Sequence, residues 1–332
     1  MNKKAVALFS GGLDSMLAIK LMLKEGIEVH ALNFLTVFCT CTKKGCMHQA
    51  TKASRELGVP LKIMNITKEY MDVVRSPKFG RGKGMNPCID CRIFTFKKAK
   101  TFMDEINASF IVTGEVLGQR PMSQRRQAIE LIEKESGLRG LIVRPLSAKY
   151  FDETLPEKNG LIKRENLLDI EGRSRQKQME LAKEFHINDY PCPAGGCLLT
   201  EVGFSKKVKD LFQYIPDYKI SDIHLLKVGR QFRIHEGLKL FVGRDQRENE
   251  LLVSFTEEGD HILDVIDMPS PIAIARGKAA KKDLLLAASI LARYSDAKEA
   301  NIKVSYKIFP SEYQESLIVS PAAEDTLSTI RL

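Results

Sequence analysis

The sequence has no hydrophobic run approaching the roughly 20 apolar residues that a membrane-spanning helix requires. Its N-terminus, Met1-Asn2-Lys3-Lys4 followed by five apolar residues, also lacks the longer apolar stretch and the small-residue cleavage site of a secretory signal. With 44% hydrophobic and 28% charged residues, the composition is typical of a globular protein. The sequence therefore predicts a cytoplasmic protein that makes no membrane contact.

Cysteine is absent from the last 135 residues, and the odd total of seven argues against complete disulfide pairing. In a reducing compartment, grouped cysteines indicate metal or redox chemistry rather than structural disulfides. The seven fall in three groups: Cys39, Cys41 and Cys46; Cys88 and Cys91; Cys192 and Cys197.

An excess of positive charge is absent from the second part of the chain, although the whole protein carries +9. Residues 1–199 hold 32 basic and 22 acidic side chains, whereas residues 200–332 hold 19 and 20. The excess therefore accompanies the cysteines, where it suits a polyanionic partner such as RNA, although surplus lysine and arginine also serve solubility alone.

The order of apolar segments predicts an α/β fold with a doubly wound parallel sheet in residues 1–205. Short apolar runs alternate with helical patterns, as expected of buried parallel strands. From about residue 216 to 332 the pattern changes to that of a smaller α+β domain, with the boundary between 201 and 218. The predicted strands are 5–9, 27–35, 61–66, 109–113 and 141–143, then 223–228, 232–234 and 238–242, and the clearest helices are 15–25, 88–106, 173–185 and 279–294.

A glycine-rich loop joins the first predicted strand to the first helix. Its glycines let backbone N–H groups turn toward an anion, and the helix N-terminus adds a partial positive charge. The lysine of a Walker A sequence is missing, which argues against a kinase or GTPase. Asp14 suits Mg²⁺ bound to the phosphates of a nucleotide. The predicted phosphate-binding residues are Ser10, Gly11, Gly12, Leu13, Asp14 and Ser15.

Cys88 and Cys91 lie three residues apart on the first turn of a predicted helix, where the helix dipole is expected to lower the pKa of a thiol. Cys192 and Cys197, in a loop rich in glycine and proline, can supply a third ligand. Three thiolates around a 4Fe–4S cluster leave one iron open. Structural zinc held by four thiols, or a nucleophilic cysteine paired with a persulfide carrier, are the alternatives.

The loop Ser10 to Ser15 matches the SGGxDS motif at every position, and the sequence here resembles the PP-loop ATP pyrophosphatases. This resemblance implies that ATP is split to AMP and pyrophosphate, with AMP transferred to a substrate oxygen. It also implies that Phe34 and Gly114 lie against the adenine.

The segment Asn86-Pro87-Cys88-Ile89-Asp90-Cys91 is similar to that of tRNA 2-thiouridine synthetases, and Gly195-Gly196-Cys197 resembles their second reactive segment. The stretch from Thr113 to Gln124 resembles 4-thiouridine synthetases. The likeness implies tRNA thiolation, with Cys88, Cys91 and Cys197 as cluster ligands and sulfide or a persulfide carrier as the sulfur donor. We expect no counterpart of the RNA-binding domain that precedes the PP-loop in 4-thiouridine synthetases.

The segment from Cys39 to His48 predicts one of three things: a separate zinc site, a loop without metal, or a relay for incoming sulfur.

Residues 220 to 310 resemble the NFACT-R RNA-binding module, with a structural or dimerisation domain, and hence a possible homodimer, as the alternative. Basic residues beside the predicted site are candidates for RNA phosphate contacts. They are Lys78, Arg81, Lys83, Arg120, Arg125 and Arg126.

The leading hypothesis is that the protein is a tRNA sulfurtransferase. An adenylating amide ligase and a non-catalytic RNA-binding sensor are the rival hypotheses.

Overall fold

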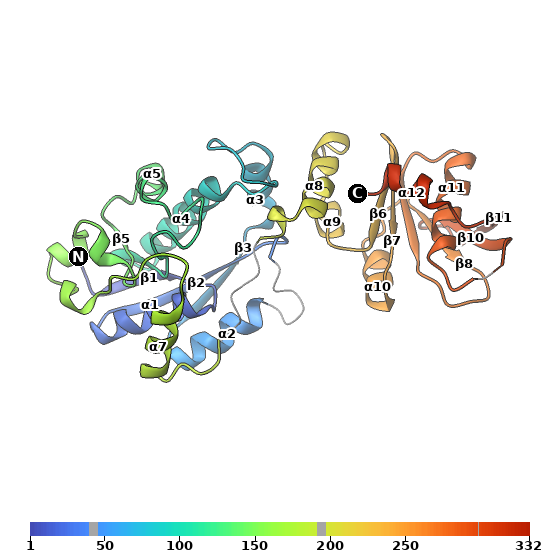
Figure 1. The fold of residues 1–332 in the computed structure, drawn as a ribbon. Helices are drawn as coiled ribbons and strands as arrows, with labels where there is room; N and C mark the ends of the chain where they lie inside the picture. The colour runs from blue at the N-terminus through green and yellow to red at the C-terminus, as the bar shows by residue number, and fades with distance from the viewer. Residues whose placement is uncertain (40–45, 191–196, 298) are drawn as a thin grey trace. The chain divides into compact units, whose positions relative to one another are not determined.

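The structure is a computed structural model that describes residues 1–39, 46–190, 197–297 and 299–332. The chain divides into two compact units, residues 1–200 and 201–332 (Figure 1). Each unit has its own sheet and its own buried apolar cluster. The two are therefore described separately.

The first unit contains a five-stranded parallel sheet in the order β3-β2-β1-β4-β5. Strands β1 and β4 are buried over almost their whole length because helices cover both faces of the sheet, which confirms the predicted doubly wound fold. The strands are β1 (Lys4–Leu8), β2 (Glu28–Leu35), β3 (Leu61–Asn65), β4 (Phe110–Thr113) and β5 (Ile142–Val143).

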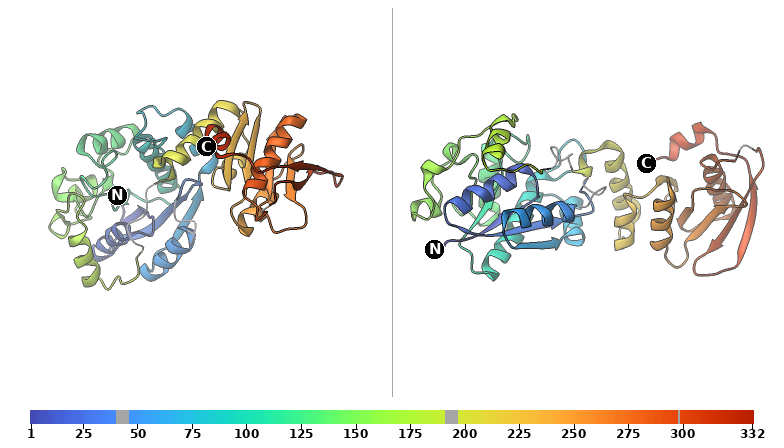
Figure 2. Two further views of the ribbon diagram at one scale, coloured as in Figure 1. Left: turned by 45° about the vertical axis from the view of Figure 1, so that its right-hand side comes forward. Right: turned by 90° about the horizontal axis from the view of Figure 1, so that it is seen from below.

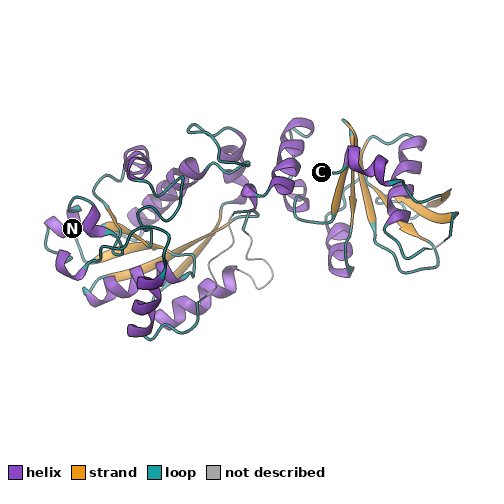
Figure 3. Ribbon diagram, in the orientation of Figure 1, coloured by secondary structure: helices purple, strands orange, loops and turns teal. Residues whose placement is uncertain are grey.

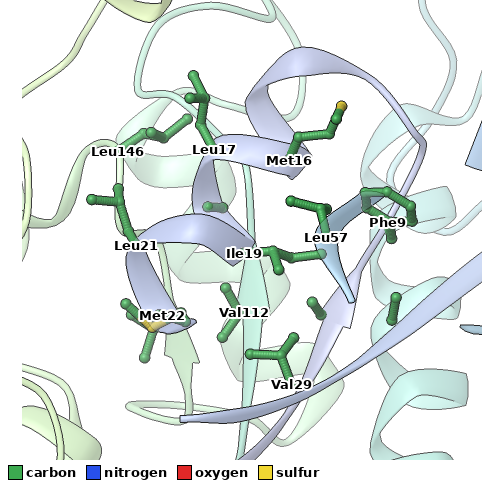
Figure 4. Packing of buried hydrophobic residues seen from close by; sticks show 14 of the residues in the cluster. Phe9, Met16, Leu17, Ile19, Leu21, Met22, Val29, Leu57, Val112 and Leu146 are labelled. Carbon is green, nitrogen blue, oxygen red and sulfur yellow. The ribbon is translucent and has the colours of Figure 1, made fainter. Parts of the chain in front are cut away.

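Helices α1 (Leu13–Lys24), α2 (Cys46–Leu57) and α7 (Gln176–Glu184) cover one face of this sheet (Figure 2). Figure 4 shows the packing of the apolar side chains of α1 against those of β2 and β4. The opposite face is covered by α4 (Cys88–Glu105) and α5 (Arg126–Ser136). Helix α1 is buried over most of its surface, so it is held firmly enough to position the loop before it.

Two further α-helices, α3 (Thr67–Arg75) and α6 (Leu155–Lys158), and several short 3₁₀ turns lie in the connections between these layers. Neither α3 nor α5 was predicted from the sequence. Both are strongly amphipathic, so the helical periodicity was present in the sequence; the prediction missed it because polar residues outnumber apolar ones in both segments.

The second unit contains a six-stranded sheet in the order β11-β10-β8-β9-β7-β6, with every pair antiparallel (Figure 3). One face packs against α11 (Lys281–Arg293), whose alanine and leucine side chains are buried. The remaining elements of the second unit are α8 (Val202–Tyr214), α9 (Ile220–Leu225), β6 (Arg230–His235), β7 (Leu238–Val242), α10 (Gln246–Ser254), β8 (His261–Val265), β9 (Ala273–Gly277), β10 (Ile302–Ile308), β11 (Gln314–Val319) and α12 (Glu324–Ile330).

No helix in the described part of the chain is both long and apolar enough to cross a bilayer.

The predicted strand over 223–228 is wrong, because helix α9 occupies the first half of this segment and a turn the second. The side chain of Asp222 accepts a 2.8 Å hydrogen bond from the backbone N–H of Lys219 and so closes the first helical turn. Asp222 is in turn paired with Arg276 of β9 at 2.7 Å. A short apolar run does not distinguish helix from strand by itself, and this ion pair to a distant strand holds the helical form.

Candidate active site

The carboxyl ends of β1, β2 and β4 lie next to one another at one edge of the parallel sheet. The loop from Ser10 follows β1, Phe38 and Cys39 come shortly after β2, and Gly114 follows β4 directly. Ligands of doubly wound proteins bind at this edge, where the strand order reverses. The predicted phosphate loop and the first cysteine segment therefore converge without being close in sequence.

The phosphate loop has a backbone shape that its glycines make possible. Gly11 adopts a φ of +75°, and Gly12 forms the N-cap of α1. The hydroxyl of Ser15 donates a 2.8 Å hydrogen bond to the Gly12 carbonyl. The hydroxyl oxygen of Ser10 lies 3.4 Å from the hydroxyl oxygen of Ser15. The loop thus directs the N-terminal end of a buried helix at the sheet edge, which is a favourable place for a phosphate.

Gly114 is the point at which the end of β4 touches this loop. A Cβ atom added to it would lie 2.5 Å from the carbonyl carbon and oxygen of Asp14 and 2.6 Å from the nitrogen of Ser15. The predicted adenine contacts of Gly114 and Phe34 remain predictions. Close backbone packing already accounts for the glycine, and Phe34 packs partly buried against the core on the α4 side.

We expect Gly114→Ala to lower the melting temperature clearly, since its methyl group would overlap backbone that cannot rotate away. Overpacking of this kind costs about 1–3 kcal/mol. Gly203→Ala is the matched control, because its added Cβ would lie in open space. Thermal unfolding followed by circular dichroism measures both, and equal melting temperatures for the two variants would contradict the close packing.

Asp14 is the first-turn acid of α1, and burial raises the pKa of its carboxyl above the ordinary value. Arg175, Gln119, Arg120 and Gln178 oppose that shift. Gln119 donates a 3.2 Å hydrogen bond to Oδ2, whereas Oδ1 is buried and has no hydrogen-bond partner among the described residues. A carboxylate oxygen left in this state at a phosphate loop fits a ligand of Mg²⁺.

Arg175 and Gln178 were not identified from the sequence, although the helix that carries them was predicted. Arg175 is the N-cap of α7 and Gln178 is completely buried. Helix α7 packs against α1, which brings both side chains to Asp14. The pattern Arg173-Ser174-Arg175-Gln176 is the signal that could have suggested them, but only the packing of α7 shows which arginine faces the loop.

Two backbone hydrogen bonds gather three cysteine-bearing segments from distant parts of the chain. The N–H of Leu198 donates to the Phe38 carbonyl at 3.0 Å, and the N–H of Met85 donates to the Leu199 carbonyl at 2.8 Å. These bonds place the segments just before Cys39 and Cys88 and the segment just after Cys197 side by side. The local spacing of the cysteines predicted only the Cys88–Cys91 pair.

The four described cysteines near this point interact electrostatically. Burial is the main cause that raises the pKa of Cys197 to about 12; a hydrogen bond from the Leu199 backbone opposes this shift, and Cys91, Cys88 and Cys39 add to it. Burial also raises the pKa of Cys91, against a hydrogen bond from the Tyr70 hydroxyl and the charge of Arg92, which lower it. The expected lowering by the helix N-terminus is therefore wrong for Cys91, because the loss of hydration outweighs the dipole.

A cluster of aromatic side chains lies beside the thiols. The ring of Tyr70 lies 5.8 Å from that of Phe38 and 6.0 Å from that of Phe94, centroid to centroid. Tyr70 is itself buried, and its pKa is raised well above the ordinary value by that burial and then by Cys91. Such surroundings exclude water and favour neutral thiols until a ligand compensates the thiolate charge.

The loop before Cys88 is held in place by polar side chains. The Asn86 amide donates to the Cys88 sulfur at 3.2 Å. Asp90 accepts hydrogen bonds from the backbone N–H groups of Lys78 and Phe79 at 2.8 and 3.0 Å. The predicted basic residues of this loop are partly engaged within the protein, since Lys78 pairs with Glu135 and the Arg81 guanidinium donates to the backbone at the end of α3.

Arg92 connects the thiol group to the phosphate loop. It follows Cys91 on α4, pairs with the buried Glu115 at 2.8 Å and lies 3.4 Å from the Thr113 hydroxyl. Thr113 precedes Gly114, whose backbone touches Asp14. The Arg92 side chain and the carboxyl end of β4 therefore lie between the thiols and the phosphate loop.

No group of three or more His, Cys, Asp or Glu side chains that could hold a metal ion exists within the described segments. The thiol donors suit iron–sulfur or zinc chemistry, but the ligand set is not preformed in these segments. Cys41 and Cys192 lie outside the described residues, as does the greater part of the loop from Cys39 to Cys46. The alternatives for the cysteines therefore remain predictions.

Comparison with known proteins divides the chain in the same way. Residues 1–153 match the family described as thiamine biosynthesis protein (ThiI), and residues 229–330 match the family described as NFACT protein RNA binding domain. A solved 4-thiouridine synthetase–RNA complex with bound ATP is 27% identical, covers 67% of this chain and 52% of its own, and has a TM-score of 0.39.

Relatives of known function are tRNA-specific 2-thiouridylases. The MnmA protein of Syntrophotalea carbinolica is 29% identical over 122 residues, which cover 34% of this chain and 34% of that protein. The MnmA protein of Francisella tularensis subsp. holarctica is 26% identical over 262 residues, covering 74% and 67%. The chain thus spans about a third of the length of the first of these relatives.

Proposed function

We propose that this protein is an ATP-dependent tRNA sulfurtransferase, because residues 1–153 match the ThiI family and residues 229–330 match the NFACT RNA binding domain family. One observation carries the proposal. A phosphate loop and a group of thiols meet at one sheet edge, separated by Arg92 and the end of β4.

In the first step a uridine carbonyl oxygen of the tRNA attacks the α-phosphorus of ATP. The bond from this phosphorus to the bridging oxygen breaks, and pyrophosphate leaves with the electron pair. The loop from Ser10 to Ser15 holds the departing pyrophosphate, and Arg175 and Arg120 stabilise its charge. Asp14 would hold Mg²⁺ through its unpartnered oxygen, and the ion would neutralise charge on the phosphates.

In the second step hydrosulfide forms a bond to the activated uridine carbon, and the carbon–oxygen bond to AMP breaks. No oxidant or reductant is needed, because sulfide enters and AMP leaves at constant oxidation state. The carbonyl oxygen must be adenylated first, since it is otherwise a very poor leaving group. Cys88, Cys91 and Cys197 hold the sulfur near the base in an environment that Tyr70 and Phe38 keep free of water.

A 4Fe–4S cluster bound by these three thiols would supply an open coordination site for the incoming sulfur. The proposal of a cluster rests on the number and chemistry of the thiols. Asn86 and Tyr70 donate hydrogen bonds to Cys88 and Cys91, which stabilises thiolates whether iron, zinc or a persulfide is present.

The reaction can be tested with unmodified tRNA transcripts, ATP, Mg²⁺ and sulfide under anaerobic conditions. We expect a thiouridine in the nucleoside digest by mass spectrometry and one pyrophosphate released for each sulfur incorporated. An adenylating amide ligase would release pyrophosphate without forming thiouridine, and its activity would require an amine or ammonia. A non-catalytic RNA-binding sensor would bind tRNA and release no pyrophosphate; either result would overturn the proposed function.

A further inference from the structure

Three arginines converge on a hollow of about 510 Å³ in the second unit. Arg230 comes from β6, Arg293 from the last turn of α11 and Arg331 from the C-terminal end of the chain. Tyr294 and Glu324 complete the lining. Elements separated by about a hundred residues thus direct guanidinium groups to one place, with only one carboxylate to balance them.

Two of the arginines are held rigidly. Arg230 lies over the Tyr294 ring, 4.4 Å from its centroid, and donates to the Gly243 carbonyl at 3.2 Å. Arg331 donates to the Tyr294 hydroxyl at 2.8 Å and pairs with Glu324 at 3.1 Å. Guanidinium groups fixed in this way lose little conformational entropy when an anion binds.

Arg293 is the least engaged of the three. Its guanidinium lies 4.0 Å from Glu324, which is beyond hydrogen-bond distance, and about half of its side chain is exposed. Since Glu324 is already paired with Arg331, the site keeps a surplus of positive charge that faces solvent. An anion with several acceptor oxygens satisfies these groups, because each guanidinium offers a planar pair of donors.

We propose that this hollow binds a phosphodiester of the tRNA substrate, with Arg293 as the main contact. The ligand class follows from the geometry: two fixed guanidinium groups, the exposed guanidinium of Arg293 and one aromatic ring suit a phosphate with its attached ribose, and the volume exceeds that of a lone phosphate. The inference rests on the proposed function, because it takes tRNA as the partner. It assigns to the second unit a defined phosphate contact although that unit is near neutral overall.

The test measures binding of a fluorescently labelled tRNA transcript to the full chain between about 50 and 200 mM salt. We expect Arg293→Ala to weaken binding about 5- to 10-fold at low salt and to reduce the slope of log K against log salt by about 0.7–0.9. Arg293→Lys should restore most of the slope. Lys282→Ala is the matched control: it removes one charge from the same helix about 17 Å away and should leave the slope unchanged.

Thermal unfolding of each variant verifies that the second unit is folded. Unchanged affinity and slope for Arg293→Ala, in a protein whose wild type thiolates tRNA, would overturn the phosphate site and leave the proposed function standing. Binding of an acidic peptide to the wild type that is lost in Arg293→Ala, while tRNA affinity is unchanged in this variant, would also overturn it, in favour of a protein partner. A wild type that binds tRNA with the expected slope yet never releases pyrophosphate would refute the proposed function alone.

Discussion

We expect Asp14→Asn to reduce ATP-dependent pyrophosphate release about 100-fold or more while leaving tRNA affinity unchanged. The substitution keeps the size and hydrogen-bonding shape of the side chain but removes its charge. Asp14 Oδ1 is the buried oxygen available to Mg²⁺ at the phosphate loop, and loss of a metal ligand of this kind costs several kcal/mol of transition-state stabilisation. Pyrophosphate release and tRNA binding are measured on the same preparation.

The melting temperature of the Asp14→Asn variant shows whether the charge of Asp14 serves the reaction or the stability of the fold. Burial raises the pKa of Asp14, so the ionised carboxylate destabilises the folded protein once the pH exceeds the ordinary value of 3.8. This cost grows as the pH rises through the elevated pKa and is then constant. At neutral pH without Mg²⁺, Asp14→Asn should therefore melt no lower than the wild type.

Asp72→Asn is the control, since it removes an exposed carboxylate from α3 of the same unit. It should change neither activity nor stability. Full pyrophosphate release by Asp14→Asn would show that this carboxylate holds no metal needed for the reaction. A large fall in its melting temperature would instead assign Asp14 a structural role, with activity lost through unfolding.

Serine in place of Cys88, Cys91 or Cys197 should abolish thiouridine formation, with losses of at least about 100-fold. Release of pyrophosphate in the presence of tRNA should persist, because the phosphate loop is on separate elements. The hydroxyl of serine is a far weaker nucleophile and metal ligand than a thiolate. Mass spectrometry of the tRNA nucleosides and a pyrophosphate assay separate the two half-reactions.

Iron content and the absorption spectrum of anaerobically purified protein test the identity of the sulfur site. The cluster hypothesis predicts a coloured wild type with about four irons per chain, and loss of colour in each of the three serine variants. Colourless, iron-free protein that still thiolates tRNA would refute it and favour a persulfide. Zinc in place of iron would favour a structural site.

The Cys39→Ser variant distinguishes a metal site with three protein ligands from one with four. Cys39 is the remaining described thiol that interacts electrostatically with Cys197. A site with three protein ligands retains its iron in this variant. A tetrahedral zinc site that uses Cys39 loses its metal. Retention of both iron and activity would leave Cys39 outside the ligand set, and loss of iron would contradict the assignment of Cys88, Cys91 and Cys197 alone.

Local sequence was sufficient to predict features whose cause is local. The predicted phosphate loop follows from an apolar strand, two glycines and a helix start within fifteen residues, and the parallel sheet follows from alternation of such segments. Cys88 and Cys91 share one helix turn because of their spacing. The predicted strand at 223–228 failed where a side chain from another strand, Arg276, decided the outcome.

The sequence by itself determined the parallel fold, the glycine-rich loop between a strand and a helix and the presence of paired thiols, because each depends on neighbours along the chain. Tertiary structure alone decided that Arg175 and Gln178 face Asp14, that Cys39 lies near Cys197, and that burial raises the pKa of Cys91 and Cys197. These properties depend on contacts between distant segments and on the exclusion of water, which no local pattern of residues encodes.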